Sequence, residues 1–395
     1  MDTITDVRDG THDSPQYVET GNPFITSKNV KDGFINYEDI QYVSDKDYEE
    51  INKRSKVDKN DILMGMIGTI GNIALVRETP DFAIKNVALI KDIGDVYYRY
   101  LYHCLQSNSV AHQLDENLDG GTQKFIALNK IRELVIPVPS EHEQHKIGDY
   151  MESLDNLITL HQRKYEKLKN VKKSMLEKMF PKNGSDVPEI RFKGFTDAWE
   201  QRKLGQQMYI KARIGWQALT KSEYLESGDY YLITGTDIDE NSHTVDLKKC
   251  FYVSKERYEM DEKIQVHEGD IIVTKDGTIG KIAMVTGLDR PATLNSHLFV
   301  LRDLSGRVDN YFLLTVLNSH LFDAFVESTK TGSTLTGMPQ KTFVEFPFLL
   351  PDIEEQKRIA TFYRNLDHLI TLHQRKHLLM KQKVILQFYS YLGTA

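Results

Sequence analysis

The sequence has little cysteine and no long apolar run. Only two cysteines, Cys104 and Cys250, occur in 395 residues, so a fold held by several disulfides is excluded and a reducing cytoplasm is the expected compartment. No basic and apolar leader stands at the N-terminus, and no apolar run approaches the roughly 18 to 20 residues of a membrane span. We therefore expect a soluble cytoplasmic protein that makes no membrane contact.

The chain also lacks an excess of positive charge. Its 50 Lys and Arg against 57 Asp and Glu give a net charge of -7, which speaks against a strongly basic domain wrapped around phosphates. The acid is concentrated in two blocks, because residues 1–140 carry 15 basic and 22 acidic side chains and residues 186–351 carry 19 and 24. Residues 141–180 have 8 basic against 7 acidic, and residues 352–391 have 7 against 4. The composition therefore alternates along the chain.

Catalytic signatures are missing as well. The sequence has no glycine-rich dinucleotide motif and no Asn-Pro-Pro-aromatic motif of adenine methyltransferases, and its loops GGTQK (120–124) and KTGST (330–334) lack the spacing of a Walker A loop. No third ligand accompanies the few histidine pairs, so we predict no metal site. The sequence predicts no catalytic residue and no cofactor bound by this chain.

What the sequence does contain is an internal repeat. LDNLITLHQRK at 154–164 returns as LDHLITLHQRK at 366–376, with one difference in eleven positions and an offset of 212. DILMGMIGTIGNIALV at 61–76 matches DIIVTKDGTIGKIAMV at 270–285 at an offset of 209. Each half is thus a diverged block of about 140 to 165 residues followed by a nearly unchanged segment of about 40.

The two 40-residue segments are predicted to be long helices. Each follows a proline and opens with a capping box, Ser140 with Glu143 and Asp352 with Glu355. Apolar residues recur in heptads, and His161 and His373 fall at the same seam position. Two seams of equal length predict an antiparallel coiled coil of helices about 60 Å long, in which these two histidines lie near each other.

The two blocks are predicted to be mixed α/β domains. Short β-rich runs alternate with turn residues, and a helix follows at 97–108 and at 310–322. The GTIG strings at 68–71 and 277–280 predict a tight turn between two strands, with glycine at positive φ. The expected fold class is therefore α+β, with two mixed α/β domains separated by two long antiparallel helices in a pseudo-twofold tandem repeat. The predicted boundaries are 1–140 for the first domain, 141–185 for the central helix and linker, 186–351 for the second domain, and 352–395 for the C-terminal helix.

This arrangement resembles the specificity subunit of type I restriction-modification systems over essentially the whole chain. The resemblance rests on the LITLHQRK helices, MLEKMF at 175–180, RFKGFTDAWEQRKLG at 191–205 and DGTH at 9–12. In that family each variable block is a target-recognition domain that reads one half of a split DNA site, while the helices fix the spacing and dock two modification subunits. The resemblance implies that this chain is not an enzyme by itself. S-adenosylmethionine, ATP and Mg are then bound by partner subunits, which methylate adenine at N6 or translocate and cut double-stranded DNA.

The blocks offer candidate DNA contacts on turns and small basic loops. These are Arg8, His12, Gln123 and Lys124 in the first block and Arg213, Lys275, Lys330 and Thr334 in the second. Base reading needs a few well-placed donors and acceptors rather than net positive charge. The net negative charge is compatible with a DNA-reading subunit, since modification subunits closing around the duplex can supply much of the phosphate attraction.

One feature departs from the family pattern, and two other classes of protein stay open. Met1 aligns near Gln206, so the counterpart of residues 191–205 falls before the first residue given. Either the native chain starts before Met1, or the first domain tolerates the loss of its opening strand. A stand-alone DNA-modifying enzyme is one alternative, although it requires a cofactor or metal motif that the chain does not show. A structural coiled-coil adaptor is the other, although an adaptor does not require two divergent folded blocks.

Overall fold

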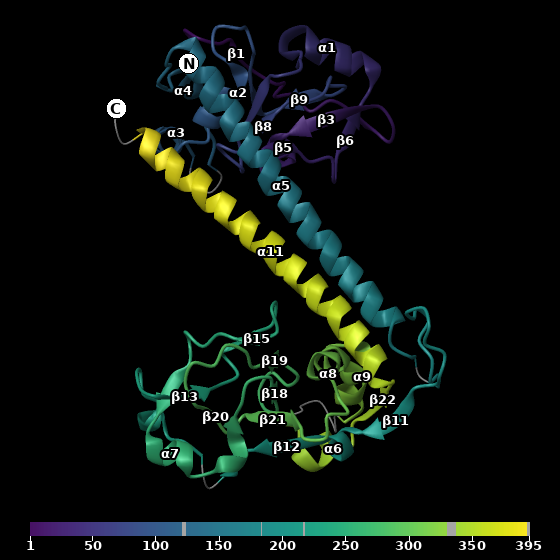
Figure 1. The fold of residues 1–395 in the computed structure, drawn as a ribbon. Helices are drawn as coiled ribbons and strands as arrows, with labels where there is room; N and C mark the ends of the chain where they lie inside the picture. Colours follow the sequence, from purple (N-terminus) through teal and green to yellow (C-terminus); the bar gives the residue numbers. More distant parts are fainter. Residues whose placement is uncertain (121–123, 183, 216–217, 330–336, 393–395) are drawn as a thin grey trace. The chain divides into compact units, whose positions relative to one another are not determined.

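The computed structural model describes residues 1–120, 124–182, 184–215, 218–329 and 337–392, with side chains up to residue 383. The chain divides into two compact units, one of Met1–Thr159 with Leu379–Ala395 and one of Leu160–Leu378. Each unit is described by itself below (Figure 1). Within the described residues, no helix is long and apolar enough to cross a membrane.

The first unit contains two four-stranded sheets. The first sheet has the order β1 (Val7–Asp9), β10 (Val87–Ile90), β7 (Ile62–Gly65) and β8 (Ile73–Leu75). The second has the order β2 (Tyr17–Val18), β6 (Gln41–Val43), β3 (Asn22–Thr26) and β9 (Ala83–Lys85). A small hairpin joins β4 (Val30–Lys31) to β5 (Phe34–Ile35). The helices are α1 (Asp45–Ser55), α2 (Tyr98–Cys104), α3 (Asn108–Glu116) and α4 (Leu128–Arg132).

The second unit repeats this plan and extends it. Its larger sheet has the order β12 (Met208–Ala212), β21 (Leu298–Asp303), β18 (Ile271–Thr274), β19 (Ile282–Met284), β15 (Thr244–Val245) and β14 (Ile238–Asp239). A second sheet has the order β16 (Phe251–Val253), β13 (Tyr230–Ile233), β20 (Ala292–Leu294) and β17 (Gln265–Val266). A two-stranded sheet pairs β11 (Glu200–Lys203) with β22 (Pro347–Leu350). The short helices are α6 (Leu204–Gln207), α7 (Lys255–Glu259), α8 (Asn310–Leu317), α9 (His320–Ser328) and α10 (Gln340–Phe343).

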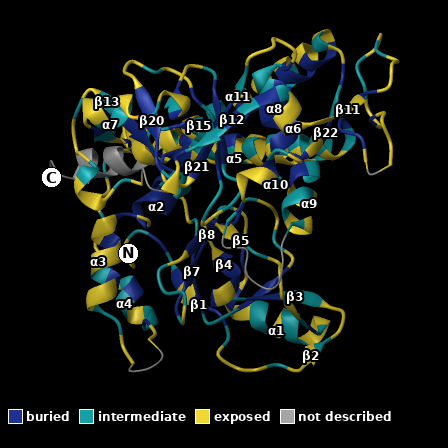
Figure 2. Ribbon diagram, turned by 90° about the horizontal axis from the view of Figure 1, so that it is seen from below, coloured by how far each residue is buried: buried dark blue, intermediate teal, exposed yellow. Residues whose placement is uncertain are grey.

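The two units share one strand order, which confirms the mixed α/β repeat. The run β1-β10-β7-β8 of the first unit corresponds to β12-β21-β18-β19 of the second, and all of these neighbours are antiparallel. In each unit a parallel pair, β3 with β9 or β13 with β20, lies in the second sheet. The central strands β18 and β7, the latter labelled in Figure 2, are buried along their whole length, as expected for apolar strands with packing on both faces.

The predicted helices after the sheets are each divided in two. Residues 97–108 form α2 and the start of α3, and residues 310–322 form α8 and the start of α9. The break comes at Ser107 and Ser319, whose hydroxyls accept the amides of Val110 and Leu321 as N-caps of the following helix. The sequence analysis predicted one helix instead of two because it did not recognise the serine as the cap of a second helix.

The two 40-residue segments are α5 (Glu141–Lys178) and α11 (Ile353–Leu392). In the second unit they contact each other, with 2.8 Å between the Nδ1 atoms of His161 and His373 and 2.7 Å between Lys172 Nζ and Asp367 Oδ1. Because a later residue of α5 meets an earlier residue of α11, the helices are antiparallel. The predicted pairing and the predicted meeting of the two histidines are confirmed.

The predicted capping box is wrong for Glu355. Asp352 does cap its helix, since its Oδ1 accepts the amide of Glu354 at 2.8 Å. Glu355, however, does not reach back, because its two carboxylate oxygens each accept a hydrogen bond from Arg191 at 2.7 Å. A bidentate, charge-assisted pair is stronger than one bond to a backbone amide, so Glu355 binds the distant arginine instead of the amide at the start of its helix.

A glutamine fastens each long helix to its own block in the same way. Gln144 Oε1 accepts the amide of Tyr97 and Gln356 Oε1 accepts the amide of Asp309, both at 2.9 Å. The side-chain amides donate to the carbonyls of Pro139 and Pro351, again at 2.9 Å. These matching bonds put the start of each helix in the same position on both blocks.

Candidate nucleic-acid interface

The hairpin of β18 and β19 ends in the glycine turn that the sequence predicted. Gly277 and Gly280 have φ of 74° and 90°, in the left-handed region that favours glycine. The hydroxyl of Thr274 closes the turn by accepting the amide of Lys281 at 2.9 Å. The two residues between β18 and this turn are Lys275 and Asp276, so a rigid hairpin presents both side chains.

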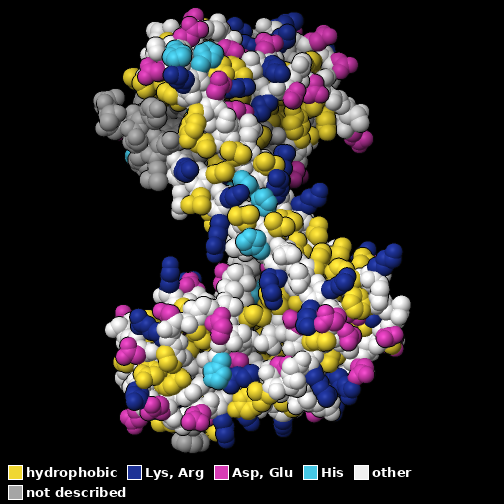
Figure 3. Space-filling view, in the orientation of Figure 1, with side chains coloured by type: hydrophobic (Ala, Val, Ile, Leu, Met, Phe, Trp, Pro, Cys, Tyr) yellow, Lys and Arg dark blue, Asp and Glu magenta, His cyan; other side chains and the backbone are white. Residues whose placement is uncertain are grey.

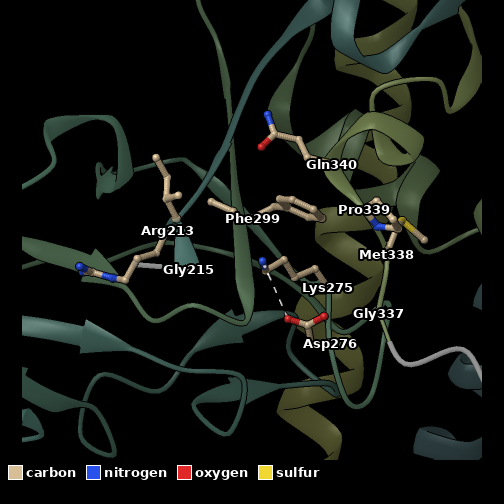
Figure 4. Close-up of a pocket in the computed structure, with 11 residues that line it drawn as sticks. Arg213, Gly215, Lys275, Asp276, Phe299, Gly337, Met338, Pro339 and Gln340 are labelled. Carbon is tan, nitrogen blue, oxygen red and sulfur yellow. Dashed lines mark ion pairs between the residues drawn. The ribbon is translucent and has the colours of Figure 1, made fainter. Parts of the chain in front are cut away.

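Lys275 and Asp276 line an open pocket of about 520 Å³ (Figure 4). Lys275 Nζ lies 5.8 Å from the centre of the Phe299 ring and 3.9 Å from Asp276 Oδ2. His297 contacts the same carboxylate oxygen, with 3.3 Å between Nδ1 and Asp276 Oδ2. The remaining lining residues are Ala212, Arg213, Ile214, Gly215, Gly337, Met338, Pro339 and Gln340.

The pocket offers both donors and acceptors. The ammonium group of Lys275 supplies up to three donors and the carboxylate of Asp276 supplies acceptors, and the imidazole of His297 beside Asp276 adds one of each. These are the groups that distinguish base edges in the major groove of DNA. Basic and acidic side chains are interspersed on the face of the second unit seen in Figure 3, so readout of this kind suits the surface better than a broad phosphate patch does.

Arg213 lies at the same pocket, but its guanidinium is turned into the protein. The residue is 2% exposed, and it donates to the Leu294 carbonyl at 2.8 Å and to the Thr293 hydroxyl at 3.2 Å. Burial lowers the pKa of the guanidinium. This arginine therefore holds β12 to β20 and supports the pocket from behind.

The first block keeps the hairpin backbone but changes its side chains. Met66 and Ile67 occupy the positions of Lys275 and Asp276. In the first block, the amide of Ile126 donates to the Met66 carbonyl at 2.9 Å, as the amide of Met338 donates to that of Lys275 at 2.7 Å. An isolated antiparallel bridge follows in both, Ile67 with Phe125 and Asp276 with Gly337. The same frame thus carries apolar groups in one block and charged groups in the other.

The polar groups of the first block lie instead around Asp9. His12 contacts Asn86 Oδ1 at 2.9 Å through Nδ1 and Asp9 Oδ2 at 2.8 Å through Nε2, and these two hydrogen bonds raise the pKa of the imidazole. Arg54 pairs with the other oxygen of Asp9, which is only 6% exposed. Arg8 donates to the Arg54 carbonyl at 3.3 Å. Two predicted contacts, Arg8 and His12, are therefore brought together around an arginine that the sequence analysis did not identify.

The other candidate residues lie in or near the two Gly/Thr/Lys loops. Lys124 is exposed. Gln123, Lys330 and Thr334 lie outside the described residues. The sequence analysis missed Arg54, Asp276 and His297, although the alignment of Lys275–Asp276 with Met66–Ile67 was a signal for the second. Among the described residues, no group of three or more His, Cys, Asp or Glu side chains is arranged to hold a metal ion.

A comparison with known families supplies the context for these two hairpins. The profile of a family described as the type I restriction modification DNA specificity domain matches residues 14–170 and 196–381. The chain belongs to this family. The expected identity as a DNA specificity subunit is confirmed, and the alternatives of a stand-alone enzyme and a structural adaptor fall away.

Individual relatives agree in extent. The chain is 23% identical over 393 residues to the putative type I restriction enzyme MjaX specificity subunit of Methanocaldococcus jannaschii, which covers 95% of this chain and 87% of that protein. A second specificity subunit of the same organism, MjaVIII, is 23% identical over 385 residues, covering 91% and 86%. The crystal structure of an S subunit from M. genitalium has the same fold, with a TM-score of 0.66 at 14% identity, covering 98% of this chain and 93% of that one.

Proposed function

We propose that residues 1–140 and residues 186–351 of this specificity subunit are two target-recognition domains that each read one half of a bipartite site in double-stranded DNA. The observation that carries the proposal is the pair of matching hairpins with different side chains before the turn. Met66 and Ile67 pack in the core of the first block, whereas Lys275 and Asp276 line a pocket of the second. A common frame with exchanged side chains is what two readers of different half-sites require, because base identity is read by a few side chains on fixed backbone.

In the second domain we assign base reading to Lys275 and Asp276 of the pocket and to His297, which contacts Asp276. A lysine donates to the guanine acceptors O6 and N7, and a carboxylate accepts from the cytosine amino group. Lys330 and Thr334 come a few residues before Gly337 of the pocket lining in the sequence, so phosphate or base contacts from these two residues are part of the proposal. Arg213 supports the pocket rather than contacting DNA.

In the first domain we assign DNA contact to the cluster around Asp9. Arg54 is 68% exposed at its side chain and His12 is 58% exposed, so both can reach a ligand while Asp9 orients them. Arg8 lies beside Arg54, and Gln123 and Lys124 complete the set from the Gly/Thr/Lys loop. A cationic cluster of this kind suits a half-site different from that of the second domain.

The paired helices, residues 141–185 and 352–395, are proposed to set the unread spacer and to dock two modification subunits. Adenine N6 methylation with S-adenosylmethionine and cleavage with ATP and Mg then belong to the modification and restriction subunits, and the assembled complex acts in the cytoplasm. The net charge of -7 supports this sharing, since the partners closing around the duplex supply phosphate attraction that this chain does not.

An exchange of domains tests the proposal. Residues 1–140 are replaced by the corresponding block of another specificity subunit, and methylated adenines are mapped across the genome of cells that carry the exchanged gene. We expect one half of the methylated site to change while the other half and the spacer stay the same. A site altered in both halves would refute modular reading.

A further inference from the structure

Two arginines and a histidine of the first block gather around one buried carboxylate. Asp9 is the last residue of β1 and is 6% exposed. Its Oδ1 pairs with Arg54, and its Oδ2 accepts a hydrogen bond from Nε2 of His12 at 2.8 Å. Arg8 donates to the backbone carbonyl of Arg54 at 3.3 Å. Because Arg54 lies 45 residues after Asp9, the tertiary fold creates this cluster.

In two of the three basic side chains every nitrogen already has a partner within the protein. The ring of His12 uses both nitrogens, since Nδ1 contacts Asn86 Oδ1 at 2.9 Å and Nε2 contacts the buried carboxylate. In Arg8, Nε and Nη2 bind Asp6 at 2.8 and 2.6 Å, and Nη1 binds the carbonyl named above. Donation to a base edge by either side chain would compete with these bonds.

Arg54 differs because a pair of its donors stays unused. Among the described residues, Nη2 is the one side-chain nitrogen of Arg54 with a hydrogen bond, which it makes to Asp9, and the side chain is 68% exposed. Nη2 has two hydrogens, one beside Nη1 and one beside Nε. Whichever of them binds the carboxylate, the other still forms a fork of two parallel donors with its neighbour.

The surrounding fold holds this guanidinium in place. The backbone of Arg54 belongs to the last turn of α1, and its tip is tied to Asp9. Asp9 in turn lies opposite Ala88 of β10, and its second oxygen is held by His12. An arginine fixed at both ends loses little freedom when it binds a ligand, so the unused fork is already organised for binding.

Such a fork suits a guanine edge better than a phosphate. In the major groove guanine presents two neighbouring acceptors, O6 and N7, whereas adenine and thymine present one acceptor each and cytosine presents a donor. The carboxylate of Asp9 partly neutralises the guanidinium, which weakens its attraction for a phosphate anion. The direction of the two free donors, on which base reading depends, is unaffected by this neutralisation.

The second block has no equivalent of this pair. At the position after the aligned arginine it has Ile214 in place of Asp9. Ten residues after the serine that caps the neighbouring helix, α1 or α7, it has Ile264 in place of Arg54. Ile264 is 1% exposed and belongs to the core. The fold shared by the two blocks therefore does not require the carboxylate or the guanidinium, as expected for a device that serves one half-site.

We propose that Arg54 reads a guanine, through O6 and N7, in the half-site of the first block, and that Asp9 is its positioning residue. The inference rests on the proposed function, because it names the base that the cluster around Asp9 contacts. Arg54 is then the specificity-determining residue of this cluster, while His12 holds the carboxylate and Arg8 holds the end of α1.

A base analogue tests the proposal. The chain in complex with its modification subunits is bound to duplexes that carry its mapped methylation site. Each guanine of the half-site that the domain exchange assigns to the first block is replaced in turn by 7-deazaguanine, which lacks the N7 acceptor. We expect one replacement to weaken binding of the unchanged chain about tenfold. The same replacement should have no further effect on Arg54→Met, since both changes remove the same contact.

A neighbouring lysine supplies the matched control. Lys53 also lies on α1, its side chain is 69% exposed, and it is paired with Glu50. Lys53→Met should leave the loss caused by 7-deazaguanine unchanged. Asp9→Asn removes the charge that holds Arg54 and should reduce this loss, whereas a purely structural role of Asp9 would weaken binding to all duplexes alike.

Three results would overturn this inference alone. They are a half-site of the first block without a G·C pair, a 7-deazaguanine effect that persists in Arg54→Met, and equal losses from Arg54→Met on all duplexes, which would mean that Arg54 contacts phosphate. Failure of the proposed function gives a different result, because the exchange of residues 1–140 would then leave the methylated site unchanged. That result would overturn the proposed function and this inference with it.

Discussion

The two blocks have the same backbone plan and different side chains on their central hairpin. Both have the antiparallel order of β1-β10-β7-β8 or β12-β21-β18-β19, and both end this hairpin in a glycine turn. Before the turn, Met66 and Ile67 of the first block pack in its core, whereas Lys275 and Asp276 of the second block line an open pocket. The strands and turns are kept in both blocks, whereas the residues before the turn serve packing in one and supply polar groups in the other.

The junctions between block and helix show the same division on a smaller scale. Gln144 and Gln356 make the same two bonds in the two halves. Glu143 and Glu355, one residue earlier, differ completely, because Glu355 is buried against Arg191 and Glu143 is exposed. The glutamine bonds hold the helix in place in both halves, whereas the acid contributes to the fold only in the second half, where an arginine pairs with it.

The largest expected effect is the difference in stability between variants that remove the charge of Glu355 and of Glu143. Glu355→Gln leaves Arg191 buried without its counter-ion and should destabilise the second block by about 3 kcal/mol. Glu143→Gln changes an exposed side chain and should stay within about 0.5 kcal/mol. Both tryptophans, Trp199 and Trp216, belong to the second block, so tryptophan fluorescence in urea measures the effect of Glu355→Gln. Circular dichroism, which also follows the first block, measures the effect of Glu143→Gln.

The matched pair of variants makes this comparison strict. If Glu143→Gln were as destabilising as Glu355→Gln, the first block would hold a buried cation at its own acid. If neither variant shifted the midpoint, the Arg191 pair would contribute nothing to stability. Either result contradicts the difference drawn here between the two junctions.

The next largest effect concerns the hairpin tips. Lys275→Met gives the second block the residue that the first block has at this position, Met66, so the fold should tolerate it. Loss of a base-contacting lysine should cost about 1 to 3 kcal/mol, a weakening of roughly 10- to 100-fold, at the half-site read by this block. Binding of the complex with its modification subunits to DNA duplexes measures the effect.

A second lysine on the same hairpin supplies the control. Lys281 lies beyond the turn and pairs with Glu240 at 2.5 Å. Lys281→Met should reduce affinity equally for all DNA sequences or not at all. Equal losses from Lys275→Met at cognate and altered half-sites would show that Lys275 contacts phosphate rather than a base.

The repeat made much of the architecture predictable from sequence. The helix starts and the two histidines are separated by the same offset of 212, so each histidine is equally far from the cap of its own helix. In an antiparallel pair this predicts that His161 lies opposite His373, as the structure has it. The GTIG strings predicted the hairpin turns because the repeated glycines indicate positions that need a positive φ. Local signals and internal comparison were sufficient for these elements.

Other features depend on partners that are distant in sequence. Glu355 bonds Arg191 across 164 residues, and no local pattern distinguishes that pair from a capping box. Arg8 and Arg213 align, yet one is exposed and the other 2% exposed, because only the second has a carbonyl and a hydroxyl of β20 within reach. The candidate DNA contacts were the least predictable part, since the exposure and grouping of these side chains follow from tertiary packing.

A smaller effect is expected from the histidine layer of the helices. A hydrogen bond between two Nδ1 atoms needs one donor and one acceptor, so the pair cannot form with both rings doubly protonated. Burial lowers the pKa of both rings, and the nearby charges of Lys164 and Lys376 act in the same direction. Since unfolding releases these rings to bind protons near their usual pKa of about 6.5, stability should fall as the pH drops through that value.

Replacing both histidines by leucine should raise stability at neutral pH by roughly 1 kcal/mol, because an apolar layer replaces a polar one. The acid sensitivity should become shallower but persist, since His103 and His243 are buried with pKa values lowered to about 4. Thermal unfolding between pH 5 and 8 measures both changes. A double variant with the original slope would show that the histidine pair does not titrate on unfolding.

The smallest expected effect is a change in spacer length with both half-sites unaltered. Because the histidines pair across the helices, the two helices have to be lengthened together, by duplicating residues 162–165 in α5 and residues 369–372 in α11. Four residues add about 6 Å along the axis, and DNA rises about 3.4 Å per base pair, so the preferred spacer should grow by one or two pairs. Duplicating only one segment breaks the register of the seam and should reduce activity instead. Sequencing of methylated sites decides the outcome. A longer spacer with the same half-sites would show that the helices set the distance and the two domains set the half-site sequences, whereas an unchanged spacer at full activity would mean that the helices do not set the distance.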